Sequence, residues 1–360
     1  MGALRETIAS ARHTADVAVR ALEALLAEHR LRYVEATELS ITRHRAGRGF
    51  SYRDDRGRVV REKDLITRFR RLAIPPAWQE VRLAPDPCWH LQALGRDALG
   101  RQQRRYHDAW AEVRNADKLR RLVRFARALP RLRASIEHDL RRPLDEPDGL
   151  CATAARLVDL ALLRPGSEEA LQTIGSRGAT TLAPSNVALA GSEIRLSFKG
   201  KSGKWIELDI RDRLLARRLA RLKETNRRRL FRIEQGDTTF ALSCADLNAY
   251  LQRVARAPIS AKDFRTFDGT AIALWRLAGT PLPSSGRACQ RVLAEVAREV
   301  SARLHNTPAI ARASYIHPAV PQAWLAGELA DERGRALLAS RGSRLVSREE
   351  SALRKFLLQR

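Results

Sequence analysis

Four short motifs, widely spaced along the chain, carry side chains that suit chemistry on a phosphodiester. Two arginines can fork onto its non-bridging oxygens, and an asparagine can donate a further hydrogen bond. A lysine can protonate a leaving oxygen, and a tyrosine can attack the phosphorus and conserve the bond energy in a covalent intermediate. None of these steps requires a metal ion or ATP. In chain order the motifs are ALLRPGSEE (161–169, with Arg164), GKSGK (200–204, with Lys201 and Lys204), KDFRTF (262–267, with Lys262 and Arg265) and HNTPAIARASYIHP (305–318, with Asn306 and Tyr315).

Each motif also has an ordinary structural explanation when it is taken alone. Arg164 suits the C-terminal end of a helix, and Asp263 suits the start of one, because each charge complements the helix dipole. GKSGK fails the phosphate-loop pattern, since position 195 is Arg where that pattern needs Gly and a strand follows. A lone tyrosine such as Tyr315 is more often a packing residue. Only the combination of the motifs therefore favours a catalytic site.

The composition narrows the class of partner. The chain has 360 residues, with 66 Lys+Arg against 41 Asp+Glu, a formal net charge of +25, and 44% apolar residues, enough for a sizeable core. A folded chain so basic needs a partner that supplies negative charge, and nucleic acid and an anionic membrane surface are the candidates. Because the basic residues are spread along the whole chain rather than gathered in one block, nucleic acid is favoured.

Other features of the sequence argue against a membrane protein, a secreted protein, a disulfide framework and a metal site. No run of 18 apolar residues is present and the N-terminus has no apolar signal segment, so we expect no membrane span and a cytoplasmic location. The four cysteines lie far apart, which argues against a disulfide framework and a zinc site. His305 and His317, twelve residues apart with no third ligand nearby, make only a weak case for a metal.

The elements that must position these side chains fall into two blocks, which predict an α+β fold. Alternating apolar residues and turn residues such as AGRG and DDRG predict a small, mainly β block. Helical periodicity then dominates, with one three-stranded sheet inserted. The first block holds strands at 39–42, 49–53, 58–60, 81–83, 90–94 and 103–106 and a helix at 63–72. The second holds helices at 108–128, 130–141, 150–163, 167–174, 211–233, 244–254, 260–278, 285–304 and 346–358 and strands at 187–189, 194–198 and 205–210.

This pattern divides the chain into four segments. A helical extension, with a helix at 3–30, precedes the β-rich domain. The mainly helical domain comes next, and a helical tail that is expected to pack on it follows. The predicted segments are 1–34 (helical extension), 35–106 (β-rich domain), 107–320 (mainly helical domain) and 321–360 (helical tail).

In combination and in order, the motifs resemble the active site of type IB DNA topoisomerases of the poxvirus-like and bacterial branch. The resemblance covers about residues 35–320 and extends to several other segments. These are TRHRAGRGFSY (42–52), IPPAW (74–78), HLQALGRDALGRQQRRYH (90–107), GATTL (178–182) and FKGKSGK (198–204).

The resemblance implies a helical catalytic domain of the tyrosine recombinase and topoisomerase IB type. With the β-rich domain it would form a monomeric clamp that closes around duplex DNA in the bacterial cytosol and nucleoid. It implies relaxation of positive and negative supercoils, with no cofactor, metal, nucleotide or membrane partner. The implied roles are Tyr315 as the nucleophile that forms a 3′-phosphotyrosyl link, Arg164 and Arg265 as transition-state arginines, Lys201 as general acid with Lys204 as its rival, and Asn306 as a hydrogen-bond donor to the phosphate.

The expected DNA contacts follow the family less closely. Arg104 stands where the family usually has an aromatic residue, Ala170 where relatives have a phosphate-contacting tyrosine, and Asn186 where bacterial relatives often have histidine. These departures leave the chemical core intact, but they prevent any inference of a cleavage sequence. The residues expected to contact DNA are Arg101, Gln103, Arg104, Tyr106, Lys204 and Lys262.

Three other functions fit parts of the sequence. A tyrosine site-specific recombinase shares the Arg–Lys–Arg–Tyr chemistry, but it typically has HxxR where this chain has KDFR at 262–265, and its N-terminal domain is helical. A non-enzymatic basic DNA-binding protein would use the motifs only as phosphate clamps and would leave no covalent adduct. A nucleotide-using enzyme is the weakest alternative, because GKSGK fails the phosphate-loop pattern.

Overall fold

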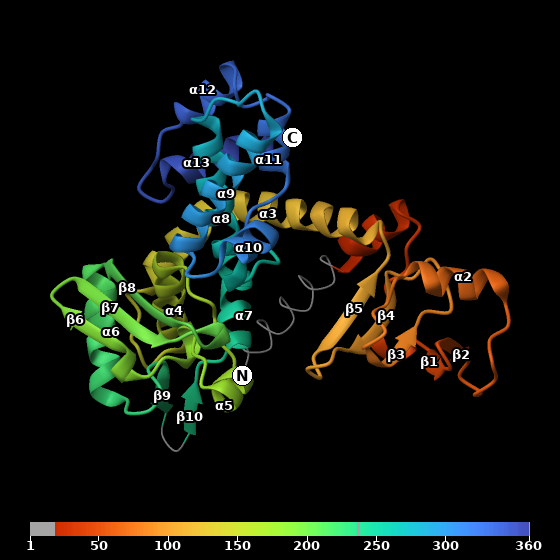
Figure 1. Ribbon diagram of the computed structural model, residues 1–360. Coiled ribbons are helices and arrows are strands. Elements are labelled where there is room, and N and C mark those ends of the chain that lie inside the picture. The colour runs from red at the N-terminus through yellow and green to blue at the C-terminus, as the bar shows by residue number, and fades with distance from the viewer. Residues whose placement is uncertain (1–18, 236–237, 360) are drawn as a thin grey trace. The chain divides into compact units, whose positions relative to one another are not determined.

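The computed structural model describes residues 19–235 and 238–359, and the chain divides into two compact units (Figure 1). Among the described residues, the first unit ends at Lys118 and the second begins at Leu119, within the long helix α3 (Trp110–Asp139). The helix expected at 3–30 is present at 19–28, and its earlier part lies outside the described residues.

The first unit is built on a five-stranded antiparallel sheet in the order β2-β1-β3-β4-β5. Arg43 ties this sheet to the IPPAW segment, because its guanidinium donates hydrogen bonds to the carbonyls of Ile74 (3.1 Å), Pro75 (3.1 Å) and Trp78 (2.8 Å). Two of the sequence motifs thus form one structural feature. The elements are a 3-10 turn (Ala36–Glu38), β1 (Ile41–Ala46), β2 (Gly49–Arg53), α2 (Lys63–Arg71), β3 (Gln79–Leu83), β4 (Leu91–Arg96) and β5 (Gln102–Tyr106).

The two faces of this sheet differ in character, as the alternation of side chains along a strand requires. Ile41, Leu83 and Ala93 are buried against Phe69 of α2 and form the core. The strand expected at 58–60 is wrong: this segment makes only an isolated bridge between Arg53 and Val59. The DDRG turn between them folds back on itself, with Asp54 accepting hydrogen bonds from Arg56 and Arg58.

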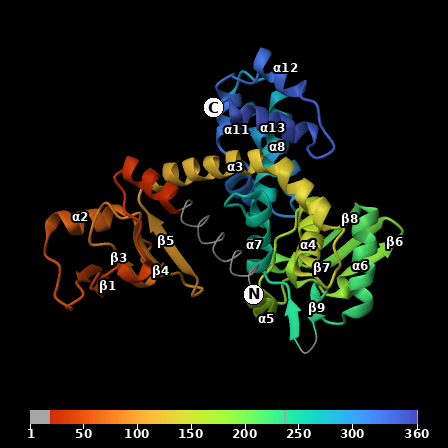
Figure 2. The same ribbon diagram turned by 180° about the vertical axis from the view of Figure 1, so that it is seen from behind.

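The second unit is mainly helical and packs around α8 (Ala261–Ala278). The C-terminal helix α13 (Arg348–Leu358) lies against α8, and its Leu353 and Phe356 are fully buried in the same core (Figure 1, Figure 2). The other helices are α4 (Pro147–Ala161), α5 (Glu168–Ile174), α6 (Arg213–Thr225), α7 (Cys244–Ala255), α9 (Gly286–Arg303), α10 (Pro308–Ile310), α11 (Ala319–Leu325) and α12 (Glu332–Leu338), with short 3-10 turns at Ala179–Thr181, Pro184–Asn186 and Lys201–Gly203 and a π-helical turn at Ala311–Tyr315.

Two small sheets interrupt these helices. The expected three-stranded sheet consists of β6 (Val187–Ala190), β7 (Glu193–Lys199) and β8 (Trp205–Arg211), in that order and antiparallel. A hairpin of β9 (Arg232–Gln235) and β10 (Thr238–Ala241) was not expected.

That hairpin replaces the end of the helix predicted at 211–233. Helix α6 ends at Thr225, because the Asn226 side chain donates to the carbonyls of Leu230 (3.2 Å) and Arg232 (3.0 Å) and turns the chain. Helical periodicity cannot detect such a turn, since Leu230 and Phe231 are apolar and buried either way.

The break predicted at Pro130 is also wrong. Helix α3 runs through this residue as a single helix of 30 residues. Proline removes one backbone hydrogen bond. Phe125, Leu129 and Leu132 on either side of it are fully buried, and each such side chain contributes about 1.5–3 kcal/mol. Packing therefore outweighs the local preference.

The α+β class expected from the sequence is confirmed: a small β-rich unit precedes a helical one that holds the three-stranded sheet. Within the described ranges, no helix combines the length and the apolar character needed to cross a membrane.

Candidate active site

A cavity of about 690 Å³ in the helical unit brings side chains of all four motifs together. The segments that reach it come from the ends of helices and from one hairpin turn, which lie up to 150 residues apart in the chain. Its lining includes every residue expected to act chemically, together with two of the expected DNA contacts. These are Arg164, Lys201, Lys204, Lys262, Arg265, Asn306 and Tyr315.

Arg265 is the buried centre of this cavity. It is 2% exposed, and its guanidinium donates hydrogen bonds to the carbonyls of Leu162 and of Leu304, the latter at 2.8 Å. These carbonyls follow α4 and α9, so the arginine joins the ends of two helices to α8. Burial lowers the pKa of Arg265, but a guanidinium stays charged at any working pH. A fixed cation is thus placed with no carboxylate in ion-pair distance among the described residues, although the charge of Asp268 also acts on it.

Tyr315 lies directly beside this cation. The guanidinium carbon of Arg265 is 4.8 Å from the centre of the Tyr315 ring, and the tyrosine is 6% exposed. Burial alone would raise the pKa of the phenol. The charge of Arg265 and a hydrogen bond from it, together with the charges of Arg164 and Lys262, outweigh burial and lower that pKa below its ordinary value. A more acidic phenol is a better nucleophile at neutral pH.

The backbone around Tyr315 is a π-helical turn, Ala311–Tyr315. Its closing hydrogen bond runs from the amide of Ile316 to the carbonyl of Ala311 (3.0 Å), five residues back. The hydroxyl of Thr270, on α8, lies 2.9 Å from the Tyr315 carbonyl and accepts a hydrogen bond from the amide of His317 (3.2 Å). Turns of this kind are rare and occur most often at functional sites.

Arg164 is held by the GATTL motif. It follows α4 after Leu162, which has a left-handed backbone (φ 50°), and its carbonyl accepts a hydrogen bond from Ala179 (2.8 Å). A Cβ atom at Gly178 would lie 2.5 Å from the Arg164 carbonyl oxygen. The glycine of the motif is therefore required by the close approach of two loops.

Asn306 presents an unsatisfied amide. It follows α9, and its backbone N–H bonds to the carbonyl of Ser301 (3.0 Å). Both polar atoms of its side chain are buried and have no hydrogen-bond partner among the described residues. Buried polar atoms without partners are uncommon in proteins, so this amide is suited to receive a ligand.

The two lysines of GKSGK lie on the turn between β7 and β8. The turn is closed by a hydrogen bond from the amide of Gly200 to the carbonyl of Lys204 (2.7 Å), and Gly203 has a left-handed backbone (φ 76°). Both Lys201 and Lys204 line the cavity, so their positions do not choose between them.

Lys262 occupies the first turn of α8, where Asp263 helps to cap the helix as predicted. The Asp263 carboxylate accepts a hydrogen bond from the backbone N–H of Ser260 (2.7 Å) and pairs with Arg121 (3.0 Å). Lys262 is left to line the cavity.

The other residues expected to contact DNA belong to the β-rich unit, and they differ in their contacts with neighbouring residues. Arg101 and the amide of Gln103 both bind Asp97 (2.8 and 2.9 Å) in the β4–β5 turn, and Tyr106 lies against Trp110 with ring centres 6.0 Å apart. Arg104 stands in a cross-strand row with Leu94 and Arg82.

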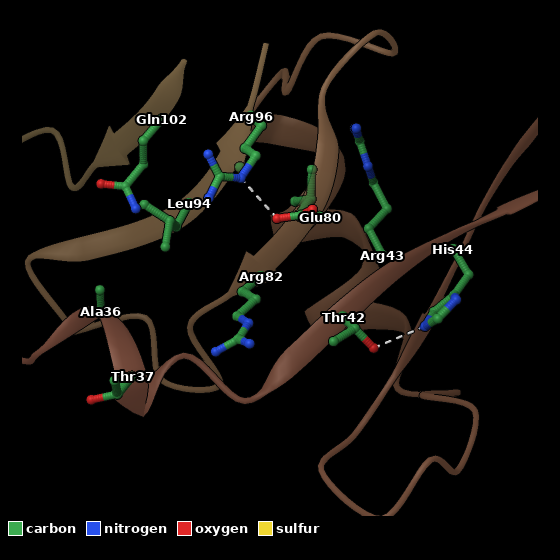
Figure 3. Close-up of a pocket in the computed structure, with 12 residues that line it drawn as sticks. Ala36, Thr37, Thr42, Arg43, His44, Glu80, Arg82, Leu94, Arg96 and Gln102 are labelled. Atoms are coloured by element: carbon green, nitrogen blue, oxygen red, sulfur yellow. Dashed lines mark hydrogen bonds and ion pairs between the residues drawn. The ribbon is translucent and has the colours of Figure 1, made fainter. Parts of the chain in front are cut away.

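That row lies on the face of the sheet opposite the core. A cavity of about 660 Å³ opens there (Figure 3), lined by Leu94 and Arg82 of the row and by polar neighbours such as His44 and Gln102. Gln102 accepts a hydrogen bond from Arg104 (2.9 Å). Gln102 and Arg82 were missed at the sequence level, because the alternation that places them beside Arg104 depends on the register of β3, β4 and β5.

Asn186 and Ala170 are the two other positions at which the chain departs from the family pattern, and their surroundings differ. Asn186 is structural, since its amide bonds to the backbone of Ala183 (2.9 Å) and Ser197 (3.0 Å). Ala170 lines the catalytic cavity, where its small side chain leaves room.

His305 and His317 do not form a metal site. His317 is buried, and its ring accepts a hydrogen bond from the amide of Ala319 (3.1 Å). His305 instead lines the catalytic cavity, as does Arg177, and neither was expected to belong to it. Within the described part of the chain, no three His, Cys, Asp or Glu side chains are grouped so that they could hold a metal ion. All four cysteines are free.

A cavity of cations around one acidified phenol suits an enzyme that acts on phosphodiesters, and comparisons with known proteins agree. Residues 107–322 match the family described as eukaryotic DNA topoisomerase I, catalytic core, and residues 49–97 match the bacterial DNA topoisomerase IB N-terminal domain. A DNA topoisomerase 1B of Acanthamoeba polyphaga mimivirus is 28% identical over 285 residues, which cover 77% of this chain and 84% of the relative.

The chain belongs to the DNA topoisomerase I catalytic-core family, and it is a DNA topoisomerase of type IB. The function and the substrate, DNA, that the motifs implied are confirmed at this level.

Proposed function

We propose that this topoisomerase breaks one strand of duplex DNA by attack of Tyr315 on a phosphodiester bound in the catalytic cavity. The observation that carries the proposal is the contact between Arg265 and the ring of Tyr315, within a cavity that the other motif residues also line. The same contact lowers the pKa of the phenol against the effect of burial.

In the proposed cleavage step, the phenolic oxygen of Tyr315 forms a bond to phosphorus as the bond to the 5′-oxygen breaks. Arg164 and Arg265 neutralise charge on the non-bridging oxygens. Asn306 donates a hydrogen bond to one of them, which would satisfy its unpartnered amide. Lys201 protonates the departing 5′-oxygen, with Lys204 on the same turn as the rival donor. The products are a 3′-phosphotyrosyl link and a free 5′-hydroxyl.

Resealing reverses these steps. The 5′-hydroxyl attacks the phosphotyrosine, and the tyrosine leaves. Because the covalent link conserves the energy of the original bond, no ATP is required, and every group that acts belongs to the chain. Between the two steps, torque in the DNA turns the free end, so supercoils of either sign relax.

We further propose that the protein acts as a monomer on duplex DNA, without nucleotide, metal or membrane partner, in the bacterial cytoplasm and nucleoid. The net charge of +25 supports DNA as the partner, since it supplies many cations for phosphate contacts. On the β-rich unit we assign the contacts to the open sheet face around Arg104 and Gln102.

The test is relaxation of a negatively supercoiled plasmid with EDTA present and ATP absent, comparing the wild type with Tyr315→Phe. We expect relaxation by the wild type, none by the variant, and a wild-type adduct on the 3′-phosphate when the reaction is stopped with SDS. Binding without relaxation or adduct would reduce the motif residues to a phosphate clamp. Relaxation confined to plasmids with a special site would favour a recombinase.

A further inference from the structure

The C-terminal end of α9 places an imidazole where helices usually place a glycine. The amide of Asn306 bonds to the carbonyl of Ser301 (3.0 Å) and that of His305 to the carbonyl of Ala302 (3.3 Å), and His305 has a φ of +50°. Glycine is the usual residue in this left-handed position after a helix. For most other residues the conformation costs about 1–2 kcal/mol, although asparagine, aspartate and histidine adopt it more readily. Leu162 and Arg256 have the same conformation after α4 and α7, so what distinguishes His305 is its place at the catalytic cavity.

The ring of His305 lies at the catalytic cavity rather than in the hydrophobic core. It lines the catalytic cavity with Arg265, Asn306 and Tyr315, and it makes no hydrogen bond to any residue that the structure describes. Burial lowers its pKa, and the charges of Arg265 and Arg303 lower it further, so the imidazole is neutral at neutral pH. A neutral imidazole has one N–H donor and one acceptor nitrogen.

The charges of the cavity decide which of these two atoms is used. The other titratable groups that line the cavity are Arg164, Arg177, Lys201, Lys204, Lys262, Arg265 and the phenol of Tyr315, so the lining contains no carboxylate to accept the N–H. The acceptor that enters such a cavity is an oxygen of the DNA phosphate. The adjacent amide of Asn306 lacks a partner for the same reason.

We propose that His305 is a further catalytic residue of this chain, whose imidazole N–H donates a hydrogen bond to a non-bridging oxygen of the scissile phosphate beside Asn306. This inference rests on the proposed function, because it requires a phosphodiester in the cavity. The two adjacent donors leave the same helix end, so α9 positions both.

The test uses His305→Gly in the full-length protein, because this variant removes the ring and relieves the backbone. Single-turnover cleavage is measured on a duplex that traps the covalent adduct, with DNA affinity and thermal unfolding measured in parallel. We expect a melting temperature equal to or above that of the wild type, unchanged affinity, and a cleavage rate lowered by about 10²-fold, the effect of removing one such donor. Added imidazole should restore part of the rate.

His305→Asn is the matched variant, since asparagine tolerates the left-handed backbone and retains an N–H donor. We expect it to cleave faster than His305→Gly. A wild-type rate for His305→Gly would overturn the proposal, as would a slow variant with a lowered melting temperature that imidazole does not improve. Tyr315→Phe, run beside these, tests the proposed function separately: if only the tyrosine variant fails to form the adduct, the general mechanism stands and the assignment of His305 falls.

Discussion

At the scale of single residues, the site depends on one buried cation. Arg265 is bonded to two backbone carbonyls and faces the Tyr315 ring, so its charge lies beside the phenol and lowers the phenol's pKa. Lysine would keep the charge but could not fork onto two carbonyls and the ring edge together. The chemistry therefore requires arginine at this position, and the identity of the residue matters as much as its charge.

Replacing Arg265 with alanine should change both the rate and its pH dependence. The arginine is the largest influence that lowers the pKa of Tyr315, so its loss should return that pKa towards or above its ordinary value. We expect single-turnover cleavage to slow by about 10²–10³-fold and the rising limb of the pH profile to move to higher pH. Arg265→Lys should retain part of the pH shift but not the rate. Arg276→Lys, on the exposed side of α8, is the control. An unmoved profile in the alanine variant would contradict this account.

A second residue on α8, Asp268, should affect stability in a pH-dependent way. Burial raises the pKa of its carboxyl, and the charges of Glu350 and Asp159 act in the same direction. Arg303 (3.9 Å) and Arg133 only partly offset this, so that the pKa is raised to about 6. A raised carboxyl pKa destabilises the fold above pH 6, by about 3 kcal/mol at most for a shift of roughly two units. That cost disappears as the pH falls towards 4.

Asp268→Asn should therefore gain stability relative to the wild type as the pH rises. The free energy of unfolding, measured with urea at pH 8, 6 and 5, should differ most between the two proteins at pH 8 and least at pH 5. The sign is opposite to that of a salt-bridged carboxylate, whose removal would harm the fold most at high pH. A difference that is constant across this range would refute the assignment.

Residue identities could be predicted from the sequence because the chemistry requires particular side chains at motif positions. All five expected catalytic residues line one cavity. The position of His305 could not be predicted, since it depends on a left-handed residue at the end of α9 that no spacing rule gives. Lys201, the expected general acid, and Lys204, its rival, both line the cavity, so their place on the turn does not choose between them.

At the scale of elements, the nucleophile is placed by two segments rather than by one. The π-helical turn sets the direction of Tyr315. The hydroxyl of Thr270, on α8, contacts the chain on both sides of Ile316: it accepts from the His317 amide, and its one proton lies within reach of the carbonyls of Tyr315 (2.9 Å) and Thr266 (2.7 Å). Gly269 allows this contact, since a Cβ there would lie 3.3 Å from the Tyr315 carbonyl. The same helix thus carries Arg265 and orients its partner.

The Thr270→Val variant should show whether Thr270 orients Tyr315 without itself taking part in the chemical step. Valine fills the same space but leaves the Tyr315 carbonyl and the His317 amide without their partner, which costs about 1–3 kcal/mol of stability. We expect slower cleavage at unchanged DNA affinity, and recovery in Thr270→Ser, which keeps the hydroxyl. Thr280→Val is a suitable control, because its hydroxyl bonds to the carbonyl four residues earlier (2.7 Å) but touches no site residue. Equal rates for the valine and serine variants would rule out a positioning role.

The periodicity of apolar residues predicted most helices and strands, and each exception is explained by particular contacts. Helix α3 continues through Pro130 because its core face is buried on both sides. The β9–β10 hairpin was missed because Asn226 ends a helix by side-chain bonds to residues further along the chain. In both cases the deciding contacts are tertiary and carry no signal in a window of sequence.

At the scale of the whole molecule, the formal charge of +25 is spread over both units. Each unit presents basic side chains at or beside a cavity: the catalytic one, and the open sheet face with Arg82 and Arg104, where, among the described residues, Glu80 pairs only with Arg96. A DNA ligand that contacts both should release counterions at both, so its affinity should fall steeply with salt. The salt slope then counts phosphate contacts independently of cleavage.

The paired substitution Arg82→Gln and Arg104→Gln, in the background of Tyr315→Phe to prevent cleavage, should lower that slope. Each lost phosphate contact reduces the log–log slope by about 0.9, so loss of both predicts a decrease of about 2. The measurement is equilibrium binding to a fluorescent duplex across a salt series. Arg348→Gln, an exposed arginine at the start of α13, changes the net charge without altering either basic surface and should leave the slope unchanged. Because Arg348→Gln removes one charge and the paired substitution removes two, a decrease half as large in the Arg348→Gln protein would mean that total charge, rather than the sheet face, sets the affinity. The assignment of that face to DNA would then be wrong.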